Sequence, residues 1–150
     1  MKTTTSLRLR RMRLADLQQV MEIERACFPN PWCQQEFEEA VATSQIWKRV
    51  IVQDDTVLGY IVWEWIHGTR NILNVAVHPD HQRAGIGRAL VQRVLKHLTP
   101  VQTQVRETNL AAQLFLRQLG FRCYGTMKRA YDGFEEDAYL FEHDNVFPAV

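Results

Sequence analysis

The sequence predicts an α/β domain in which a mixed central β-sheet is flanked by helices on both faces. Short β-branched runs, typical of buried strands, alternate with longer runs whose apolar residues recur at helical spacing. The resulting order of elements is β-α-α-β-β-β-α-β-α-β-β, which is typical of a mixed sheet. The 150 residues are most simply one domain, residues 1–150.

Each element follows from apolar spacing and from the residues that interrupt it. Asp54-Asp55 marks a hairpin turn, Pro29 and Pro100 end two helices, and Gly120 closes a third. In chain order, we expect a strand at 7–12, a helix from 15 or 16 to before Pro29, a helix from about 34, strands at 47–52, 57–66 and 71–77, a helix at 86–98, a strand at 101–105, a helix at 109–119, and a strand pair at 121–129 and 136–142.

Composition and charge limit the possible partners. The net charge is +1, which gives no overall reason to expect nucleic acid, and we interpret the arginine-rich stretch 8–13 as an amphipathic first strand. No apolar run approaches the ~20 residues of a membrane span, so we expect no membrane partner. Three cysteines without metal-ligand spacing and without an apolar leader indicate reduced thiols and a cytoplasmic protein.

The most informative motif is the stretch 82–87, Gln-Arg-Ala-Gly-Ile-Gly, between a predicted strand and a predicted helix. Ile86, Leu90, Val94, Leu95 and Leu98 would form one apolar stripe of that helix. Two glycines leave the first backbone N–H groups bare, and the helix dipole adds a partial positive charge there. The stretch therefore predicts a phosphate site, with a helix that merely begins at glycines as the alternative.

Other known sites do not fit this region. A dinucleotide fingerprint would have a third glycine where Leu90 stands, and a P-loop would have Lys where Arg88 stands. The group His78, Asp80 and His81 has the residue types of a metal site, but its spacing matches no familiar one. We therefore expect no metal.

A set of motifs along nearly the whole chain resembles the GNAT superfamily of acyl-CoA-dependent N-acetyltransferases, most nearly the RimI-type enzymes that acetylate the α-amino group of a ribosomal protein. The resemblance implies the GNAT fold, acetyl-CoA as cofactor and CoA as product. The motifs are Phe28-Pro29, Pro31-Trp32, Asn-Val-Ala-Val-His-Pro at 74–79, Gln82 to Gly87, Val105-Arg106, Thr108-Asn109, Leu119-Gly120-Phe121, Asp132-Gly133 and Glu136-Asp137-Ala138.

The same resemblance assigns a cofactor site. The strand at Val75 and Val77 would pair with the pantetheine arm, and the following loop and helix start would wrap the pyrophosphate with backbone N–H groups. Asn109 would also contact the cofactor, with a plain helix N-cap as the alternative. The cofactor-binding residues implied are Val75, Ala76, Val77, Gln82, Arg83, Ala84, Gly85, Ile86, Gly87, Arg88 and Asn109.

The proton-transfer residues of the family are missing. Gln104 stands where RimI-type enzymes carry a glutamate base, Leu116 where they carry a tyrosine acid, and Asn71 nearest to the glutamate of other GNAT enzymes. As replacement catalytic residues we name Glu64 and Tyr131, although a solvated or ion-paired Glu64 and a packing Tyr131 are the plainer interpretations.

The sequence thus predicts an N-acetyltransferase that acts by direct attack of a primary amine in a ternary complex. Without a strong base, a low-pKa amine such as a protein N-terminus is the expected acceptor. Glu24 is a further candidate to contact that amine, with a structural role as the alternative. The competing hypothesis is a non-catalytic acyl-CoA binder that kept the cofactor site alone. Neither the acceptor's identity nor the oligomeric state follows from these residues.

Overall fold

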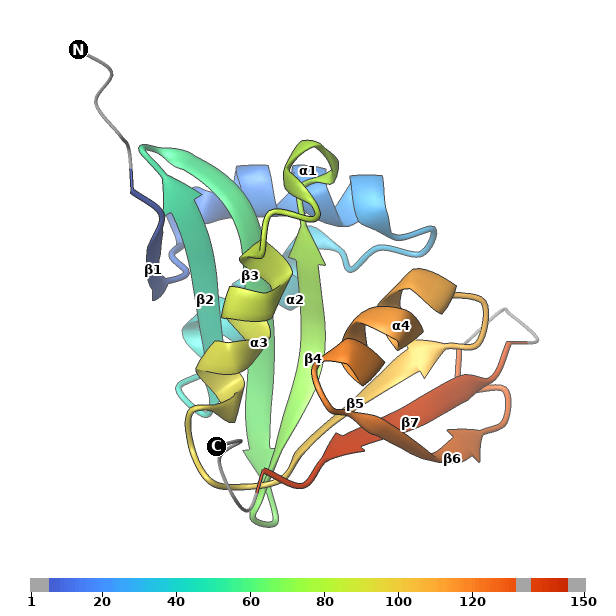
Figure 1. Cartoon of the computed structure of the whole chain (residues 1–150). Helices are drawn as coiled ribbons and strands as arrows, with labels where there is room; N and C mark the ends of the chain where they lie inside the picture. Colours follow the sequence, from blue (N-terminus) through green and yellow to red (C-terminus); the bar gives the residue numbers. More distant parts are fainter. Residues whose placement is uncertain (1–5, 132–135, 146–150) are drawn as a thin grey trace. The chain divides into compact units, whose positions relative to one another are not determined.

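The computed structural model describes residues 6–131 and 136–145, and in this part of the chain it has seven strands and four α-helices (Figure 1). The strand order is β1-β2-β3-β4-β5-β7-β6, so the predicted mixed sheet is confirmed. The elements are β1 (Arg8–Arg11), α1 (Leu17–Cys27), α2 (Gln34–Ala42), β2 (Ile46–Gln53), β3 (Thr56–Ile66), β4 (Thr69–Val77), α3 (Ile86–Leu95), β5 (Val101–Arg106), α4 (Leu110–Gln118), β6 (Arg122–Met127) and β7 (Ala138–His143), with short 3-10 turns at Leu14–Asp16 and Pro79–His81.

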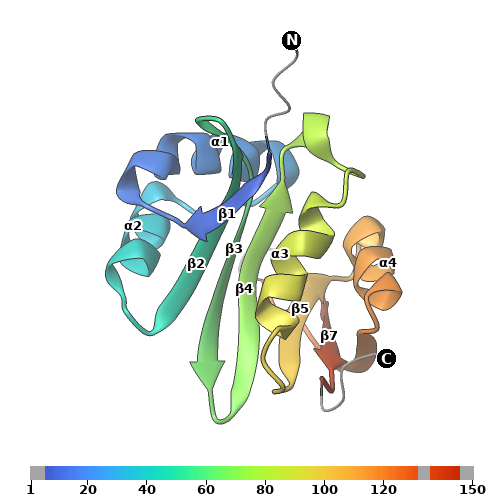
Figure 2. The same cartoon turned by 60° about the vertical axis from the view of Figure 1, so that its left-hand side comes forward.

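The chain divides into two compact units, residues 1–64 with 74–93 and residues 65–73 with 94–150. In the first unit, β1, β2 and β3 pair antiparallel in sequence order. Helices α1 and α2 lie on one face of these strands and α3 on the other, as predicted (Figure 2). The two faces alternate along β3: Tyr60 contacts Phe37 of α2 edge-on, with ring centroids 5.7 Å apart, whereas Gly59 lies against Leu90 of α3.

The first strand is confirmed, but its leucines do not form a buried face. Leu7 and Leu9 are 47% and 36% exposed, whereas Arg10 is half-buried. The reason is Asp16, which is itself buried and accepts two hydrogen bonds of 2.8 Å from the Arg10 guanidinium. A bidentate ion pair therefore holds the inward side of this strand.

In the second unit, the first half of β4 runs parallel to β5, with Asn71 opposite Gln102, and β5, β7 and β6 pair antiparallel. Helix α4 ends as predicted at Gly120, whose φ of +94° is the left-handed conformation that closes a helix. The Phe121 N–H completes this end by donating to the Leu116 carbonyl at 3.0 Å.

Helix α3 is shorter than predicted. It ends at Leu95, and Leu98, expected on its apolar stripe, is 61% exposed. The Asn145 amide provides the physical reason, because it donates to the carbonyls of Leu95 (2.9 Å), His97 and Thr99 (3.1 Å). These bonds stabilise an irregular turn in place of the last helical turn.

Candidate active site

The predicted phosphate site lies in the first unit, where β4 ends and α3 begins. The loop residues 82–85 are exposed, and two of them have left-handed backbone conformations, Arg83 with φ +65° and Gly85 with φ +82°. The first turn of the helix closes with a hydrogen bond of 3.1 Å from the Ala89 N–H to the Gly85 carbonyl. The N–H groups of residues 86–88 precede that bond, so they have no acceptor within the helix.

Side chains of the loop hold this conformation from within. The Asp80 N–H donates to His78 Nδ1 at 3.1 Å, and Gln82 Nε2 donates to the Val77 carbonyl at 3.1 Å. The His78 N–H continues the sheet by donating to the Leu58 carbonyl, 2.8 Å. His78 and the Asp80 backbone thus shape the loop. Within residues 6–131 and 136–145, no group of three or more His, Cys, Asp or Glu side chains is placed to hold a metal ion.

Gly59 on β3 permits the close approach of β4 and α3 to that strand. The sequence analysis did not identify this glycine. A Cβ there would lie 2.9 Å from the Ala76 carbonyl oxygen, 3.2 Å from Leu90 and 3.3 Å from Ile86. Its neighbours therefore include β4 and the first residue of α3. An alternation broken by glycine within a strand was the available signal, because glycine there often marks close backbone approach.

A pyrophosphate fits this loop on physical grounds. Nothing lies within 4 Å of the position that a Cβ of Gly85 would occupy, so the space beside the turn is open. Bare N–H groups at the start of a ten-residue helix provide hydrogen-bond donors and a partial positive charge. Arg83 and Arg88, both exposed, add positive charge to the same segment.

The candidate base Glu64 also belongs to the first unit. It lies near the end of β3, opposite Ile46 of β2, and is half-buried. By strand alternation it shares the face of Val62 and Tyr60, whereas Trp63 faces the side of α3, where Arg93 lies 5.8 Å from its ring centroid.

Glu24 is a buried carboxylate that is surrounded by hydrogen-bond donors of the protein. It is 2% exposed, and its carboxylate accepts hydrogen bonds from Tyr60, Asn74 and the Trp32 N–H. Burial raises the pKa of Tyr60 far above its usual value, and the Glu24 charge raises it further, so the phenol stays a donor. These contacts therefore favour the structural role of Glu24 over direct contact with the acceptor amine.

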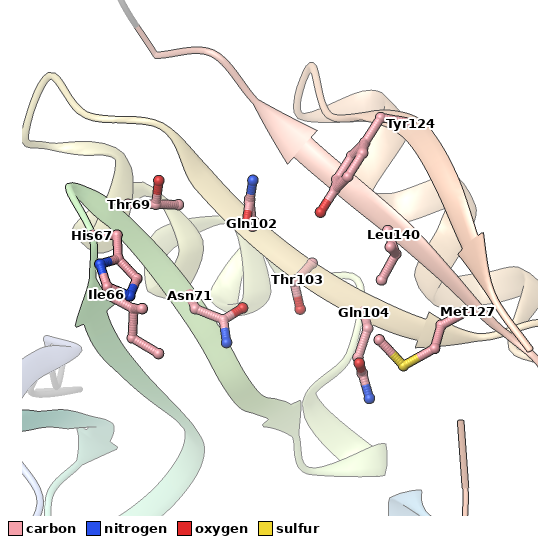
Figure 3. A pocket seen from close by; sticks show the side chains of 10 residues that line it. All are labelled: Ile66, His67, Thr69, Asn71, Gln102, Thr103, Gln104, Tyr124, Met127 and Leu140. Carbon is pink, nitrogen blue, oxygen red and sulfur yellow. The ribbon is translucent and has the colours of Figure 1, made fainter. Parts of the chain in front are cut away.

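The second unit contains an open pocket of about 350 Å³ (Figure 3). It brings together Asn71 and Gln104, the two positions at which GNAT enzymes were expected to carry a glutamate. Among the described residues no carboxylate lines it, and its polar side chains include the amides of Asn71, Gln102 and Gln104. The lining residues are Ile66, His67, Thr69, Asn71, Gln102, Thr103, Gln104, Tyr124, Met127 and Leu140.

Tyr131 lies beside Gln104 in this second unit. Burial raises the pKa of its phenol, while the Arg106 charge and a side-chain hydrogen bond with Gln104 partly oppose that rise. The Arg106 guanidinium carbon lies 3.8 Å from the ring centroid, and Glu136 holds Arg106 by an ion pair of 2.8 Å. The tyrosine is thus held in place as a neutral proton donor.

The other predicted positions of this unit have structural roles. Leu116, at the family's acid position, is 4% exposed in the last turn of α4. Asn109 is the N-cap of α4, because its side-chain oxygen accepts from the Ala112 N–H at 3.1 Å. Asp132 and Gly133, which carried part of the resemblance, lie outside the described residues.

Comparison with known proteins decides the family. The family model described as the Acetyltransferase (GNAT) family matches residues 17–121, more than half of the chain. The chain belongs to the GNAT acetyltransferase family. The cofactor of this acetyltransferase is therefore acetyl-CoA.

Named relatives cover most of the chain. It is 28% identical, over 91% of its length and 94% of the relative's, to a putative ribosomal protein bS18-alanine N-acetyltransferase of Bacillus subtilis. It is 30% identical, over 89% of its length and 90% of the relative's, to an N-alpha-acetyltransferase of Sulfurisphaera tokodaii.

Solved structures share the fold. Arabidopsis thaliana NAA60 in complex with acetyl-CoA superposes with a TM-score of 0.81 at 20% identity, covering 92% of this chain and 98% of that one. The ribosomal-protein-S18-alanine N-acetyltransferase of Escherichia coli superposes with a TM-score of 0.80 at 22% identity, covering 91% of this chain and 92% of that one.

Helices of the described residues are too short or too polar to cross a membrane.

Proposed function

We propose that this GNAT enzyme acetylates the α-amino group of a protein N-terminus, in the cytoplasm, by direct attack of the amine on the thioester of acetyl-CoA. One observation carries the choice of acceptor: in the part of the chain that the structure describes, amides and no carboxylate line the pocket that contains Asn71 and Gln104. The names of the relatives from Bacillus subtilis and Sulfurisphaera tokodaii, an alanine N-acetyltransferase and an N-alpha-acetyltransferase, support the same choice.

The energetics of deprotonation favour an α-amine. A lysine with a pKa of ~10.4 must lose its proton at pH 7 at a cost of about 4.6 kcal/mol, since 3.4 pKa units correspond to ~1.36 kcal/mol each. The same arithmetic gives only about 1 kcal/mol for an α-amine with a pKa near 7.8. A site without a strong base can therefore use an α-amine far more easily than a lysine.

Acetyl-CoA supplies the activated acetyl group, and the residues of this chain bind and orient it. We assign the pantetheine arm to the backbone of Val75 to Val77 and the pyrophosphate to the N–H groups of residues 82–88. Asn109 is kept as a further cofactor contact through the part of its amide that does not cap α4. The exposed loop and the left-handed Gly85 support the pyrophosphate assignment.

For proton transfer we keep Glu64 as the base, acting through a water, and Tyr131 as the acid toward the departing thiolate. The half-buried position of Glu64 and the raised pKa of Tyr131 support these roles. Alignment of the amine with the thioester contributes the larger part of the rate, since proximity is worth ~7–11 kcal/mol.

The test measures thiol release from acetyl-CoA with two matched peptides. One has a free N-terminus and no lysine, and the other has a blocked N-terminus and one internal lysine. We expect the first to react at least tenfold faster at pH 7. Faster acetylation of the lysine peptide would refute the proposal, and tight acetyl-CoA binding without turnover on either peptide would establish the acyl-CoA binder instead.

A further inference from the structure

The buried carboxylate of Glu24 joins three parts of the first unit. Asn74 Nδ2 of β4 lies 3.0 and 2.9 Å from its two oxygens, and Tyr60 of β3 donates its hydroxyl to the second. The Trp32 N–H, in the segment between α1 and α2, donates to the first oxygen at 3.0 Å. All of these donors are paired with a carboxylate that is 2% exposed.

Aromatic rings give the same segment a second attachment. The Trp32 ring contacts Phe37 with centroids 5.1 Å apart, and Phe37 contacts Tyr60 edge-on at 5.7 Å. Tyr60 in turn donates to Glu24, which accepts from the Trp32 N–H, so the chain of contacts begins at the Trp32 ring and ends at the Trp32 backbone. Residues 28–33 are thereby fixed through both the main chain and a side chain of Trp32.

This segment begins beside the cofactor strand. Cys27, the last residue of α1, donates its thiol to the Val77 carbonyl at 3.3 Å. Asn74 directly precedes Val75 on β4, so one Glu24 partner adjoins the residues assigned to the pantetheine arm. The mostly exposed residues 28–33 therefore start at the carboxyl-terminal end of β4. Glu24 also links them to Asn74, at the end of the assigned pantetheine stretch that lies away from the phosphate loop, where the acetyl group is expected.

We propose that Glu24 is a positioning residue, which fixes residues 28–33 relative to β4 so that they recognise the acceptor. This proposal rests on the function proposed above. Glu24 does not act on the amine itself, because its oxygens are occupied by protein donors. Its loss releases the segment while leaving the phosphate loop 82–88 intact.

The network specifies a carboxylate at position 24. Glu24→Gln would place an amide NH₂ against the donors that now surround it, which leaves buried donors unpaired. Asn74→Asp would place a second carboxylate beside the first. The double variant exchanges the amide and the carboxylate, so the amide introduced at position 24 can donate to the carboxylate introduced at position 74. The new amide oxygen then takes the place of the oxygen that the Trp32 N–H reaches, and its NH₂ takes the place of the oxygen at Tyr60, whose hydroxyl can accept as well as donate.

The experiment measures four proteins and a control. For wild type, Glu24→Gln, Asn74→Asp and the double variant, we would determine the Kd of acetyl-CoA, the KM and kcat with an N-terminal peptide, and hydrogen exchange at the Trp32 amide. Glu22→Gln is the matched control, since Glu22 is exposed on the same helix. If Glu24→Gln does not fold, the same measurements are made on Tyr60→Phe, which removes only one of the donors to Glu24.

We expect Glu24→Gln to raise the acceptor KM about tenfold, the equivalent of one hydrogen bond to a charged group. The Kd of acetyl-CoA should change less than about twofold, and exchange at Trp32 should accelerate. The double variant should recover most of the loss, and Glu22→Gln should behave as wild type.

An acceptor KM that stays at the wild-type value in Glu24→Gln would overturn the proposal, as would a double variant no better than the single ones. Wild-type protein that binds acetyl-CoA without turnover would instead refute the proposed function. In that case faster exchange at Trp32 would still support the positioning role, and unchanged exchange would refute it.

Discussion

Gly59 provides the sharpest test of how the cofactor region is built. A Cβ at this position would lie 2.9 Å from a backbone oxygen, that of Ala76, and 3.2 to 3.3 Å from Leu90 and Ile86. Leu90 and Ile86 are 0% and 3% exposed, so neither has open space into which it can retreat. Gly59→Ala must therefore push β4 or the start of α3 away from β3.

The magnitude follows from two opposing terms. Overpacking by one methyl group costs about 1–3 kcal/mol, whereas replacing glycine stabilises by about 0.4–1 kcal/mol through the unfolded chain. We expect a net loss of about 1–2 kcal/mol in the free energy of unfolding, with a fall in Tm of ~2–4 °C for each kcal/mol. Because Ala76 and Ile86 flank the cofactor loop, the Kd of acetyl-CoA should rise roughly tenfold, or 1.4 kcal/mol.

Denaturant unfolding and calorimetric titration with acetyl-CoA would measure both effects. Gly125→Ala is the matched control, because its Cβ would lie 3.6 Å from Leu140 in ordinary contact. It should stay within about 0.5 kcal/mol of wild type. If Gly59→Ala also stayed within that margin and bound acetyl-CoA normally, the close approach would not be what shapes the cofactor region.

Three further predictions concern other residues. Gly85→Ala forces a side chain into φ +82° and should cost about 1–2 kcal/mol of loop strain, seen as weaker acetyl-CoA binding and a fall in Tm of ~2–4 °C for each kcal/mol. Burial acts to raise the pKa of Asp16, but hydrogen bonds from Arg10 and the Arg13 N–H outweigh it and hold that pKa below its usual value. Asp16→Asn should thus lose about 1–3 kcal/mol at neutral pH, and urea unfolding at several pH values should show this difference in full above pH ~4 and shrinking as the pH falls through the depressed pKa. Gln104→Glu restores a carboxylate to the pocket and should raise the rate with a lysine peptide at least about tenfold, and an unchanged pH–rate profile would mean that position 104 does not reach the amine.

The elements were predictable because each is encoded locally. Alternating apolar residues placed β2 and β3 within one residue of their observed bounds, and Gly120 ended α4 as expected. The end of α3 was not predictable, since the Asn145 amide that ends it lies about 50 residues further along the chain. A local pattern contains no information about such a partner.

The candidate site divides in the same way. The exposed loop before α3 was predictable, because glycines and the apolar spacing of the following helix determine it without distant partners, and its binding of a phosphate stays a prediction. Glu24 was ambiguous, because its role depends on Tyr60 and Asn74, which the fold brings together from separate strands. Gly59 escaped notice because a close approach is defined by three neighbours, none of them adjacent in sequence.

Asn145 has a practical consequence for anyone who shortens or extends this chain. Its amide satisfies the carbonyls of Leu95 and Thr99, so a protein cut before residue 145 leaves the turn between α3 and β5 without these donors. A fusion joined directly at this residue would also have to respect its left-handed backbone, φ +50°. A fusion partner should therefore be attached beyond residue 145, because a cut before it removes the donors that stabilise the turn after α3.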